Sequence, residues 1–367
     1  MSEKTCRWGI LSTANIAEKN WLAIKNSGNA TVSGVASRSV EKAQTFIDSC
    51  QSHAPLATPP KAYGSYEELF AADDVDAVYI PIPTGLRKDW AIKAAEAGKH
   101  VMGEKPAAKN ASEVQEILDA CAANNVQYMD GVMYMHSDRM PLLREALDDP
   151  DTIGNVKRIT SNFSFAAGQD FLEENIRMTS ELEPMGCLGD LGWYTSRMVL
   201  FIMNYEMPEK VVGRLLTTQS RADSPEPVPV EFSAELFYPN GVSATYYNSF
   251  ITENQQWVNI AGTKGFIQIP DFVLPFVGAE VGFDIQQAKF SVKGCDFDME
   301  SHVNQVRTRE FGSSHENAQE TKLFRNFSAM VNSGQLDPFW GEITLKTQRL
   351  LDAALASAKQ DGVPVAP

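Results

Sequence analysis

The first 131 residues alternate between short apolar segments and helix-like segments, and this order restricts the folds open to the chain. Strand-like runs occur at 7–11, 31–36, 76–80, 100–102 and 126–129, and helix-like runs lie between them at 15–27, 39–50, 87–97 and 112–124. Repeated strand–helix–strand order is typical of a parallel sheet with helices on both faces. The crossovers of such a sheet are right-handed. The sequence therefore predicts an α/β, Rossmann-type doubly wound domain over residues 1–131.

The pattern changes after about residue 153, where strand-like segments follow one another with few helices between them. These segments are 156–165, 210–218, 230–238, 242–250, 257–262 and 265–269, and helices are expected at 188–203, 315–331 and 342–359. Strands in series favour antiparallel pairing, and Pro239-Asn240-Gly241 is a turn signal between two of them. Residues 132–367 are therefore expected to form a C-terminal α+β domain with a large open, mainly antiparallel sheet.

Charge and hydropathy exclude several classes of partner. The chain carries 47 acidic and 32 basic residues, a net charge of -15. An acidic protein is repelled by nucleic-acid phosphates and by acidic membrane surfaces. No apolar run approaches the roughly 20 residues that a membrane span needs. We therefore expect neither a nucleic acid nor a membrane as partner.

The cysteines and histidines give little sign of disulfides or metal. The five cysteines are scattered without a Cys-x-x-Cys spacing, and the five histidines show no paired spacing. Reduced thiols are the simplest account of such cysteines. No charged and apolar leader opens the chain at Met1–Cys6. These features predict a cytoplasmic protein without a metal site.

A degenerate nucleotide-binding turn follows the first expected strand. Dinucleotide-binding domains place G-x-G-x-x-G/A there, and this chain has Ser12-Thr13-Ala14-Asn15-Ile16-Ala17. Ser12 and Ala14 replace two glycines, while Ala17 fits the relaxed pattern. The start of the following helix still offers free amides and the positive end of its dipole. Two interpretations fit this run: a site that binds a cofactor, or a nucleotide-type fold that no longer binds nucleotide.

The ends of the second and third strands bear on which cofactor would bind. After the second strand the chain reads Ser37-Arg38-Ser39, without the acid that usually accepts from the ribose of NAD. Arginine pairs bidentately with phosphate, so this end favours NADP over NAD. After the third strand, Pro81, Pro83 and Thr84 belong to a stiff loop at the carboxyl edge. That loop either lies against a cofactor ring or is a rigid turn without a ligand.

Three residues suggest proton transfer. Lys105, in Glu104-Lys105-Pro106, follows the fourth strand, where ligands bind in such sheets. Asp190 and Tyr194 are spaced i, i+4 on the expected helix 188–203, which places them on one face. A nearby ammonium lowers the pKa of a phenol from its ordinary value of about 10. We therefore expect Tyr194 as acid/base, Lys105 as the group that lowers its pKa and binds a substrate hydroxyl, and Asp190 as the orienting carboxylate. Asp190 as a helix N-cap and Tyr194 as a half-buried core aromatic are the structural alternatives.

Two further residues are candidates for substrate contact. His136 follows the fifth strand at the ligand edge and either bonds a hydroxyl or is a satisfied structural histidine. Trp193 lies beside the expected catalytic pair. Its ring either stacks on a sugar or packs in the core.

Together, the Ser37-Arg38 pair, Pro81–Thr84, Glu104–Pro106 and the run Gly189-Asp190-Leu191-Gly192-Trp193-Tyr194 resemble the Gfo/Idh/MocA oxidoreductases over essentially the whole chain. Because this run ends in a tyrosine, Tyr194, it is most similar to the same run in the branch of dimeric dihydrodiol dehydrogenases and NADP-dependent D-xylose dehydrogenases. Ser12 and Ala14 depart from the family's glycines, and Arg87-Lys88 stands where many members have histidine.

The resemblance implies an enzyme that transfers a hydride between the nicotinamide of NADP and a hydroxyl or carbonyl of a sugar or diol. It also permits Lys105 itself as the proton-transfer group. It implies a homodimer or higher homo-oligomer formed through the C-terminal sheet. The cofactor-binding residues it implies are Ser12, Thr13, Ala14, Asn15, Ile16, Ser37, Arg38, Pro81, Pro83, Thr84, Glu104 and Lys105. A non-catalytic nucleotide- or sugar-binding regulator that keeps the fold is the alternative.

Overall fold

The computed structural model describes residues 4–367, which form two compact units. Unit 1 contains the described residues up to Ser137 together with Glu181–Pro184 and Gly312–Gln348, and unit 2 contains Asp138–Ser180, Met185–Phe311 and Arg349–Pro367. The expectation about the start of the chain rests partly on residues 1–3, which lie outside the described residues. Within residues 4–367, no helix has the length and apolar character that crossing a membrane requires.

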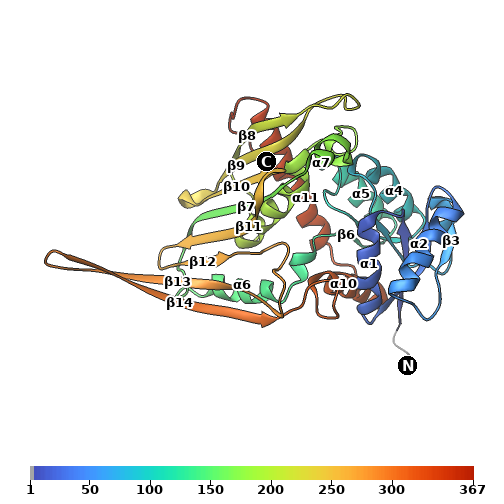
Figure 1. The fold of residues 1–367 in the computed structure, drawn as a ribbon, viewed down its shortest axis with the longest axis horizontal. Helices are drawn as coiled ribbons and strands as arrows, with labels where there is room; N and C mark the ends of the chain where they lie inside the picture. Colours follow the sequence, from blue (N-terminus) through green and yellow to red (C-terminus); the bar gives the residue numbers. More distant parts are fainter. Residues whose placement is uncertain (1–3) are drawn as a thin grey trace. The chain divides into compact units, whose positions relative to one another are not determined.

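Unit 1 is built on a parallel sheet (Figure 1). Across residues 4–367 it has six strands in the order β3-β2-β1-β4-β5-β6, and the predicted doubly wound arrangement is confirmed. The strands are β1 (Cys6–Leu11), β2 (Ala30–Ala36), β3 (Lys61–Tyr63), β4 (Ala77–Ile80), β5 (His100–Gly103) and β6 (Tyr128–Asp130). The helices between them are α1 (Asn15–Asn26), α2 (Val40–His53), α3 (Tyr66–Phe70), α4 (Thr84–Glu96) and α5 (Ala111–Ala123). The sequence pattern gave no sign of the short β3 and α3.

Helices cover both faces of this sheet. Trp8 of β1 packs on Phe324 of α10 (Gln319–Ser333), at 5.1 Å between ring centroids, and its indole donates to Ser328 Oγ at 3.0 Å. The next residue, Gly9, faces α3, where an added Cβ would lie 2.9 Å from Leu69 Cδ2. Because successive strand residues point to opposite faces, α10 and α3 cover opposite sides of β1. The chain's late helix α10 thus completes the core of the nucleotide-type unit.

Unit 2 is built on a second, mainly antiparallel sheet (Figure 1). In the described part of the chain it has eight strands in the order β14-β13-β12-β11-β7-β10-β9-β8, and the β7–β10 pair is parallel. The strands are β7 (Val156–Ala166), β8 (Lys210–Gln219), β9 (Val228–Phe237), β10 (Ser243–Ser249), β11 (Ile251–Gly262), β12 (Phe266–Ile269), β13 (Glu280–Lys293) and β14 (Asp296–Arg309). The predicted turn at 239–241 joins β9 to its antiparallel neighbour β10. The sequence analysis assigned no strand to 280–309.

One face of this sheet is covered and the other is open. Along β7, Ile159 and Phe163 are buried, whereas Arg158 and Thr160 are partly exposed. The covering helices are α6 (Arg139–Asp148), α8 (Gly186–Asp190), α9 (Gly192–Ile202) and the last part of α11 (Phe339–Ala358). The shorter elements of unit 2 are α7 (Gln169–Glu174), η2 (Ile176–Met178) and η3 (Pro239–Gly241), whereas η1 (Met133–His136) belongs to unit 1. This alternation is that of an antiparallel sheet with one solvated face.

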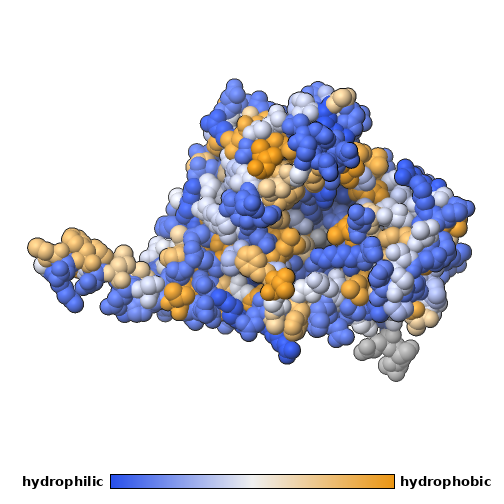
Figure 2. All heavy atoms as spheres, viewed as in Figure 1, coloured by the Kyte–Doolittle hydropathy of each residue, from blue (hydrophilic) through white to orange (hydrophobic). Residues whose placement is uncertain are grey.

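The far ends of β13 and β14 extend beyond the neighbouring strands as a two-stranded arm (Figure 1). Figure 2 shows hydrophobic residues along one side of the free end of this arm and hydrophilic residues along the other. Every residue from Ala288 to Gln305 is exposed. A two-stranded ribbon is only marginally stable by itself in water.

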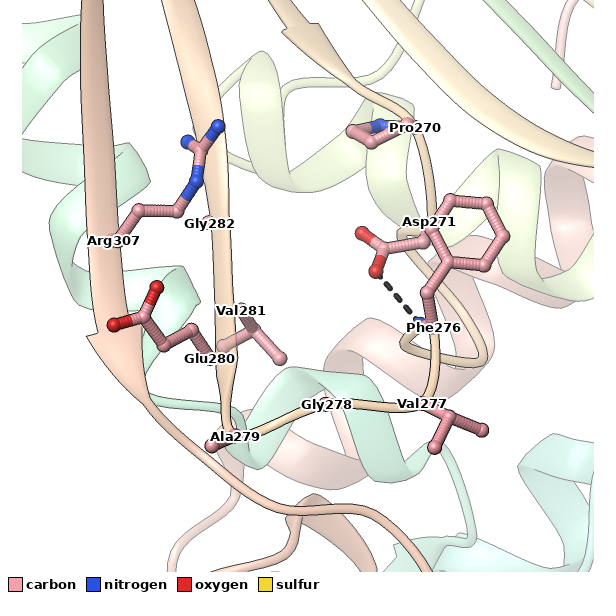
Figure 3. A pocket seen from close by; sticks show the side chains of 10 residues that line it. All are labelled: Pro270, Asp271, Phe276, Val277, Gly278, Ala279, Glu280, Val281, Gly282 and Arg307. Atoms are coloured by element: carbon pink, nitrogen blue, oxygen red, sulfur yellow. Dashed lines mark hydrogen bonds between the residues drawn. The ribbon is translucent and has the colours of Figure 1, made fainter.

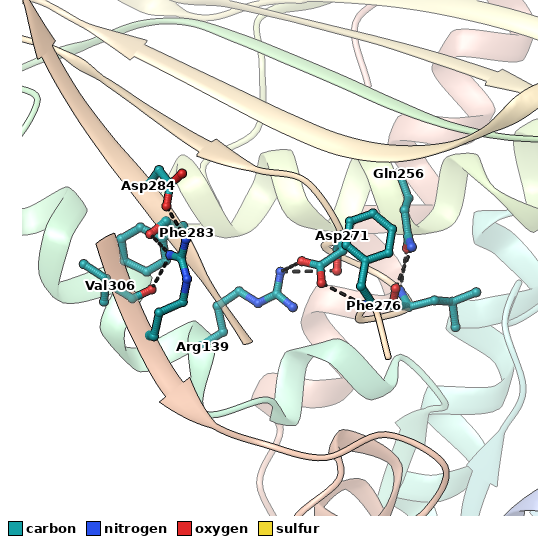
Figure 4. A network of polar contacts seen from close by, with 9 residues as sticks. Arg139, Gln256, Asp271, Phe276, Phe283, Asp284 and Val306 are labelled. Atoms are coloured by element: carbon teal, nitrogen blue, oxygen red, sulfur yellow. Dashed lines mark hydrogen bonds and ion pairs between the residues drawn. The ribbon is translucent and has the colours of Figure 1, made fainter. Parts of the chain in front are cut away.

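A buried ion pair fastens the loop between β12 and β13. Asp271 and Phe276 of this loop line a hollow with Gly282 of β13 and Arg307 of β14 (Figure 3). Arg139 Nη1 of α6 lies 2.8 Å from Asp271 Oδ1, and their side chains are 2% and 9% exposed (Figure 4). The second oxygen of Asp271 accepts from the Phe276 amide at 2.9 Å. Because the pair is buried, loss of one partner would leave the other charge uncompensated.

Candidate active site

The loops at the carboxyl edge of the unit 1 sheet carry the predicted cofactor residues. In the observed strand order the chain switches direction between β1 and β4, which is where open α/β sheets bind ligands. The β1–α1 turn (Ser12–Ala14) and the β4–α4 turn (Pro81–Pro83) flank this point, and Lys105 follows the next strand, β5. The fold therefore brings these separate sequence segments to one edge.

The β1–α1 turn has a shape suited to a phosphate despite its missing glycines. Ser12 adopts φ 81°, a backbone region that glycine usually occupies, and its amide donates to Ala36 O at 2.8 Å. Ala14 is the N-cap of α1 and makes no side-chain cap hydrogen bond, and its own amide donates to Ser12 Oγ at 3.4 Å. The amides at a helix start and the helix dipole favour an anion. The residues present therefore fit the pyrophosphate of a dinucleotide.

The end of β2 offers positive charge beside the start of α2. Arg38 is exposed, while Ser37 is buried and its amide donates to Tyr63 O at 3.2 Å. Ser39 caps α2 by accepting from the Lys42 amide at 3.3 Å. A hollow beside this helix is lined by Thr13, Glu41, Lys42, Thr45, Phe46 and Ser49. Arg38, Lys42 and the helix start together favour a phosphate on the cofactor's ribose.

The β4–α4 turn is held by a strap from a distant part of the chain, Glu181–Pro184. The amide and hydroxyl of Thr84 donate to the carboxylate of Glu183 at 3.0 and 2.7 Å, and the Gly85 amide donates to Leu182 O at 2.8 Å. A Cβ at Gly85 would lie 2.1 Å from Glu181 O, so only glycine fits there. Both donors of Thr84 are thus used inside unit 1. Sequence reasoning missed Glu183 because no local pattern marks it.

Glu104 anchors the loop that carries Lys105. Its carboxylate accepts from the Tyr79 hydroxyl at 2.5 Å and from the Lys105 amide at 3.2 Å. The Asn20 side chain donates to the same hydroxyl at 2.6 Å. Burial, followed by the charge of Glu104, raises the pKa of Tyr79 well above its ordinary value, so the phenol stays protonated as a donor. Glu104 therefore fixes the position of the loop that carries Lys105.

Arg87 joins the loop that carries Lys105 to the loop that follows β4. Its guanidinium is buried and donates to the carbonyl of Pro106 and, at 2.6 Å, to the carbonyl of Ile82. Both carbonyls belong to loops at the carboxyl edge of the sheet, after β5 and after β4. The sequence marked Arg87 only as a departure from the family. Its contacts identify it as a residue that positions the Lys105 loop.

In unit 2 the prediction of one continuous helix over residues 188–203 is wrong. It is divided into α8, which ends at Asp190, and α9, which begins at Gly192, with Leu191 at φ -102° and ψ -38° between them. Gly189 and Gly192 lie at the break, and glycine is a poor helix former. Asp190 Oδ2 lies 3.0 Å from Arg177 Nε of η2. Arg177 is a partner of Asp190 that the sequence analysis did not propose.

Burial bears on the aromatic candidates. Tyr194 is 8% exposed, and its ring lies edge-on to Phe163 of β7 with centroids 5.6 Å apart. Trp193 is completely buried, which favours core packing over stacking on a sugar. In unit 1, His136 stacks on Trp340 at 4.6 Å and its Nδ1 lies 3.0 Å from Asn326 Nδ2, which favours a structural histidine. Among the described residues, no cluster of three or more His, Cys, Asp or Glu side chains could hold a metal ion.

The strand order, the switch point and the turn at the start of α1 define unit 1 as the nucleotide-binding unit of a Rossmann-type oxidoreductase. The chain belongs to the Gfo/Idh/MocA family. The family's NAD-binding Rossmann-fold model matches residues 6–132, and its C-terminal domain model matches residues 142–268. The resemblance stated from the motifs is thereby confirmed.

Three similar proteins illustrate the family. D-xylose 1-dehydrogenase (NADP(+)) 2 of Haloferax volcanii is 33% identical over 75% of this chain and 80% of its own length. Trans-1,2-dihydrobenzene-1,2-diol dehydrogenase of Xenopus laevis is 30% identical over 76% of this chain and 81% of its own. The structure of KijD10, a 3-ketoreductase from Actinomadura kijaniata in complex with NADP and TDP-benzene, shares the fold with a TM-score of 0.78 and 23% identity over 96% of this chain and 98% of that chain.

Proposed function

We propose that this chain is an NADP-dependent oxidoreductase that transfers a hydride between nicotinamide and a hydroxyl or carbonyl group of a sugar or diol. The observation that carries the proposal is Lys105, held at the ligand edge of unit 1 by Glu104 and by Arg87. The activities named for the Haloferax and Xenopus relatives, on D-xylose and on a dihydrodiol, support the substrate class.

Residues 1–131 serve as the dinucleotide-binding domain, and residues 132–367 as the substrate and oligomerisation domain, except that Gly312–Gln348 pack as part of unit 1. When bound, the nicotinamide supplies the hydride acceptor or donor. Tyr194 takes the proton from the substrate oxygen or returns it, and Lys105 lowers the pKa of that phenol and binds the hydroxyl. Asp190, paired with Arg177, orients the substrate. Lys105 as the proton-transfer group itself is the second assignment of the same residues.

NADP is preferred over NAD because of the charge at the end of β2. Arg38 is exposed there, Lys42 follows on the first turn of α2, and the four residues Ser37–Val40 contain no carboxylate. A guanidinium at this place favours the 2′-phosphate, whereas a ribose hydroxyl would be held by an acid.

The test is a titration of the purified protein with NADPH and with NADH, followed by fluorescence or calorimetry. We expect NADPH to bind tighter than NADH by about 10- to 100-fold, a difference of about 1.4–2.7 kcal/mol. Arg38→Ser should remove most of this difference by weakening NADPH alone. Lys25→Ser, at the far end of α1, is the matched control. Binding of neither nucleotide would instead favour the non-catalytic regulator.

We further propose that the chain forms a homodimer through the open face of the unit 2 sheet and works in the cytoplasm. The open face presents partly exposed aromatic residues, among them Tyr247 and Trp257. All five cysteines are free, and four of them are buried, as in a reducing compartment. A monomer in light scattering at micromolar concentration would contradict the dimer.

A further inference from the structure

The arm at the far end of unit 2 has two chemically different faces. The arm is defined here as Ala288–Ser301, the outer parts of β13 and β14 with the turn between them. Phe290 lies opposite Met299, and Val292 lies opposite Phe297, so these side chains share one face. Gly294 begins the two-residue turn with φ 63°, which a type II′ hairpin needs at its first central position.

The second face of the arm is charged, with two lysines and three carboxylates, and Asp298 lies opposite the uncharged Ser291. Lys289 lies opposite Glu300, and Lys293 lies opposite Asp296. Directly opposed charges of different sign stabilise a hairpin locally. This face is hydrophilic and suited to water, in contrast to the apolar one.

The apolar face is unusually exposed for hydrophobic side chains. Phe290, Val292, Phe297 and Met299 are 59%, 53%, 72% and 67% exposed. The rings of Phe290 and Phe297 are stacked with centroids 6.0 Å apart, so they form one contiguous patch. Contiguous apolar patches of this kind mark interaction surfaces.

The apolar face of the arm continues the open face of the sheet. Along β13, Phe283 and Ile285 point into the core, and Asp284 and Gln286 point to the open side. Because side chains alternate along a strand, Phe290 and Val292 fall on the same side as Asp284 and Gln286. Two copies that meet through their open faces would thus each present this apolar face to the other copy.

We propose that the arm is a clasp that packs its apolar face on a second copy of this chain. The proposal rests on the homodimer proposed above and names the segment that stabilises it. The four exposed side chains, with Val303 at the root of the arm, offer on the order of 500 Å² of apolar surface per arm. Two arms and the surfaces they cover would bury roughly 2,000 Å², which is the size of a stable interface. A partner without two-fold symmetry would receive only one arm and would bury about half of this area. The C-terminal family model ends at residue 268, before the arm.

The decisive variant shortens the arm without disturbing its root or its turn. Deletion of 288–293 and of 296–301 joins Gln287 and His302 through the native Gly294-Cys295 turn. Gln287 lies directly opposite His302, just as Lys293 lies opposite Asp296. The deletion removes an even number of residues from each strand, so the remaining side chains keep their faces and the hairpin keeps its register. Sedimentation velocity over a concentration series should show the dimer dissociation constant rising by about 100-fold or more.

Point variants separate the two faces in a full-length arm. The triple variant Phe290→Thr, Phe297→Thr and Met299→Thr removes the apolar face and retains strand propensity. Lys289→Thr, Ser291→Thr and Glu300→Thr make the same change on the charged face without altering net charge. We expect only the first triple variant to weaken the dimer.

The possible results test the clasp, the dimer and the proposed enzymatic function separately. An unchanged dissociation constant in the shortened variant would overturn the clasp and leave the dimer standing. A monomeric wild type would overturn both. Neither result bears on NADPH affinity, because the arm contains none of the cofactor residues.

Cys295 provides a second measurement at the tip of the arm. It is exposed, whereas Cys6, Cys50, Cys121 and Cys187 are buried. An environment-sensitive maleimide on Cys295 should shift to shorter emission wavelength as the wild type dimerises. A label whose emission is independent of concentration across the dimerisation range would contradict the clasp.

Discussion

The two sheets of this protein differ in what covers them and therefore in where they can carry function. The parallel sheet of unit 1 is covered on both faces by helices such as α3 and α10, so its loops at the carboxyl edge remain for ligands. The sheet of unit 2 is covered on one face, and its other face continues into the β13–β14 arm. The first arrangement favours chemistry at an edge, and the second favours association through a surface.

The comparison predicts that changes at the unit 1 edge alter turnover or cofactor binding without altering assembly. Changes in the arm should do the reverse. Changes inside either core should lower the stability of the unit that contains them.

Lys105→Ala should lower turnover with NADP⁺ by about 10³-fold, within the range of proton-transfer groups. The reason is that Lys105 is assigned to tune or perform proton transfer. D-xylose and trans-dihydrobenzenediol are the first substrates to assay. Sedimentation should stay close to wild type, because Lys105 lies in unit 1 and not in the arm. Lys109→Ala removes a nearby lysine that pairs with Glu113 and should keep full turnover. Full turnover in Lys105→Ala itself would contradict the assigned mechanism.

Asp271→Ala should destabilise unit 2 by about 3–5 kcal/mol, because it leaves the Arg139 guanidinium buried without its partner. Hydrogen exchange of amides in β7 and β11 measures this loss directly. The double variant Arg139→Met with Asp271→Leu should recover most of it, since both charges are then gone. Equal exchange in Asp271→Ala and wild type would show that the pair does not stabilise the unit.

Arg87→Met should lower kcat by about 10- to 100-fold with little change in NADPH affinity. The change leaves the carbonyls of Pro106 and Ile82 without their buried donor, at about 1–3 kcal/mol for each group. Arg87→Lys should recover part of the rate, because it restores one donor. If kcat and NADPH affinity fell together in proportion to the loss of folded protein, Arg87 would be structural only.

Arg7→Gln should cost unit 1 about 1 kcal/mol at neutral pH, an estimate reduced for the partial exposure of both side chains. Burial tends to raise the pKa of Asp76, but hydrogen bonds from Arg7 outweigh it and hold that pKa below its ordinary value. The stabilisation is therefore present above the unfolded pKa of about 3.9 and is lost as pH falls through the folded pKa. The stability difference between the two proteins should begin to shrink near the unfolded pKa and should vanish once the pH lies below the lowered folded pKa of Asp76. A difference that persisted there would rule out this linkage.

Local sequence patterns determined most of unit 1 and the identity of its edge residues. The alternation of apolar runs and helices predicted the parallel sheet, and the Glu104-Lys105-Pro106 motif was recognised without any contact. The turn between β9 and β10 could equally be predicted from the sequence, because Pro239-Asn240-Gly241 has strong backbone preferences. These features depend on neighbours in the sequence.

Tertiary structure alone decided the rest. Glu183 caps α4 and Arg87 joins two loops through contacts between residues far apart in the chain, which no local period reveals. Strands β13 and β14 are an exception, because residues 289–293 and 296–300 alternate between polar and apolar side chains around Gly294, a local hairpin pattern that the prediction missed. The expected helix is divided at Leu191, and Gly192 just after the division lies close to a distant strand, since a Cβ there would lie 3.0 Å from Asn248 Oδ1. Sequence determines what each segment favours, whereas packing between distant segments decides which of those preferences the folded chain keeps.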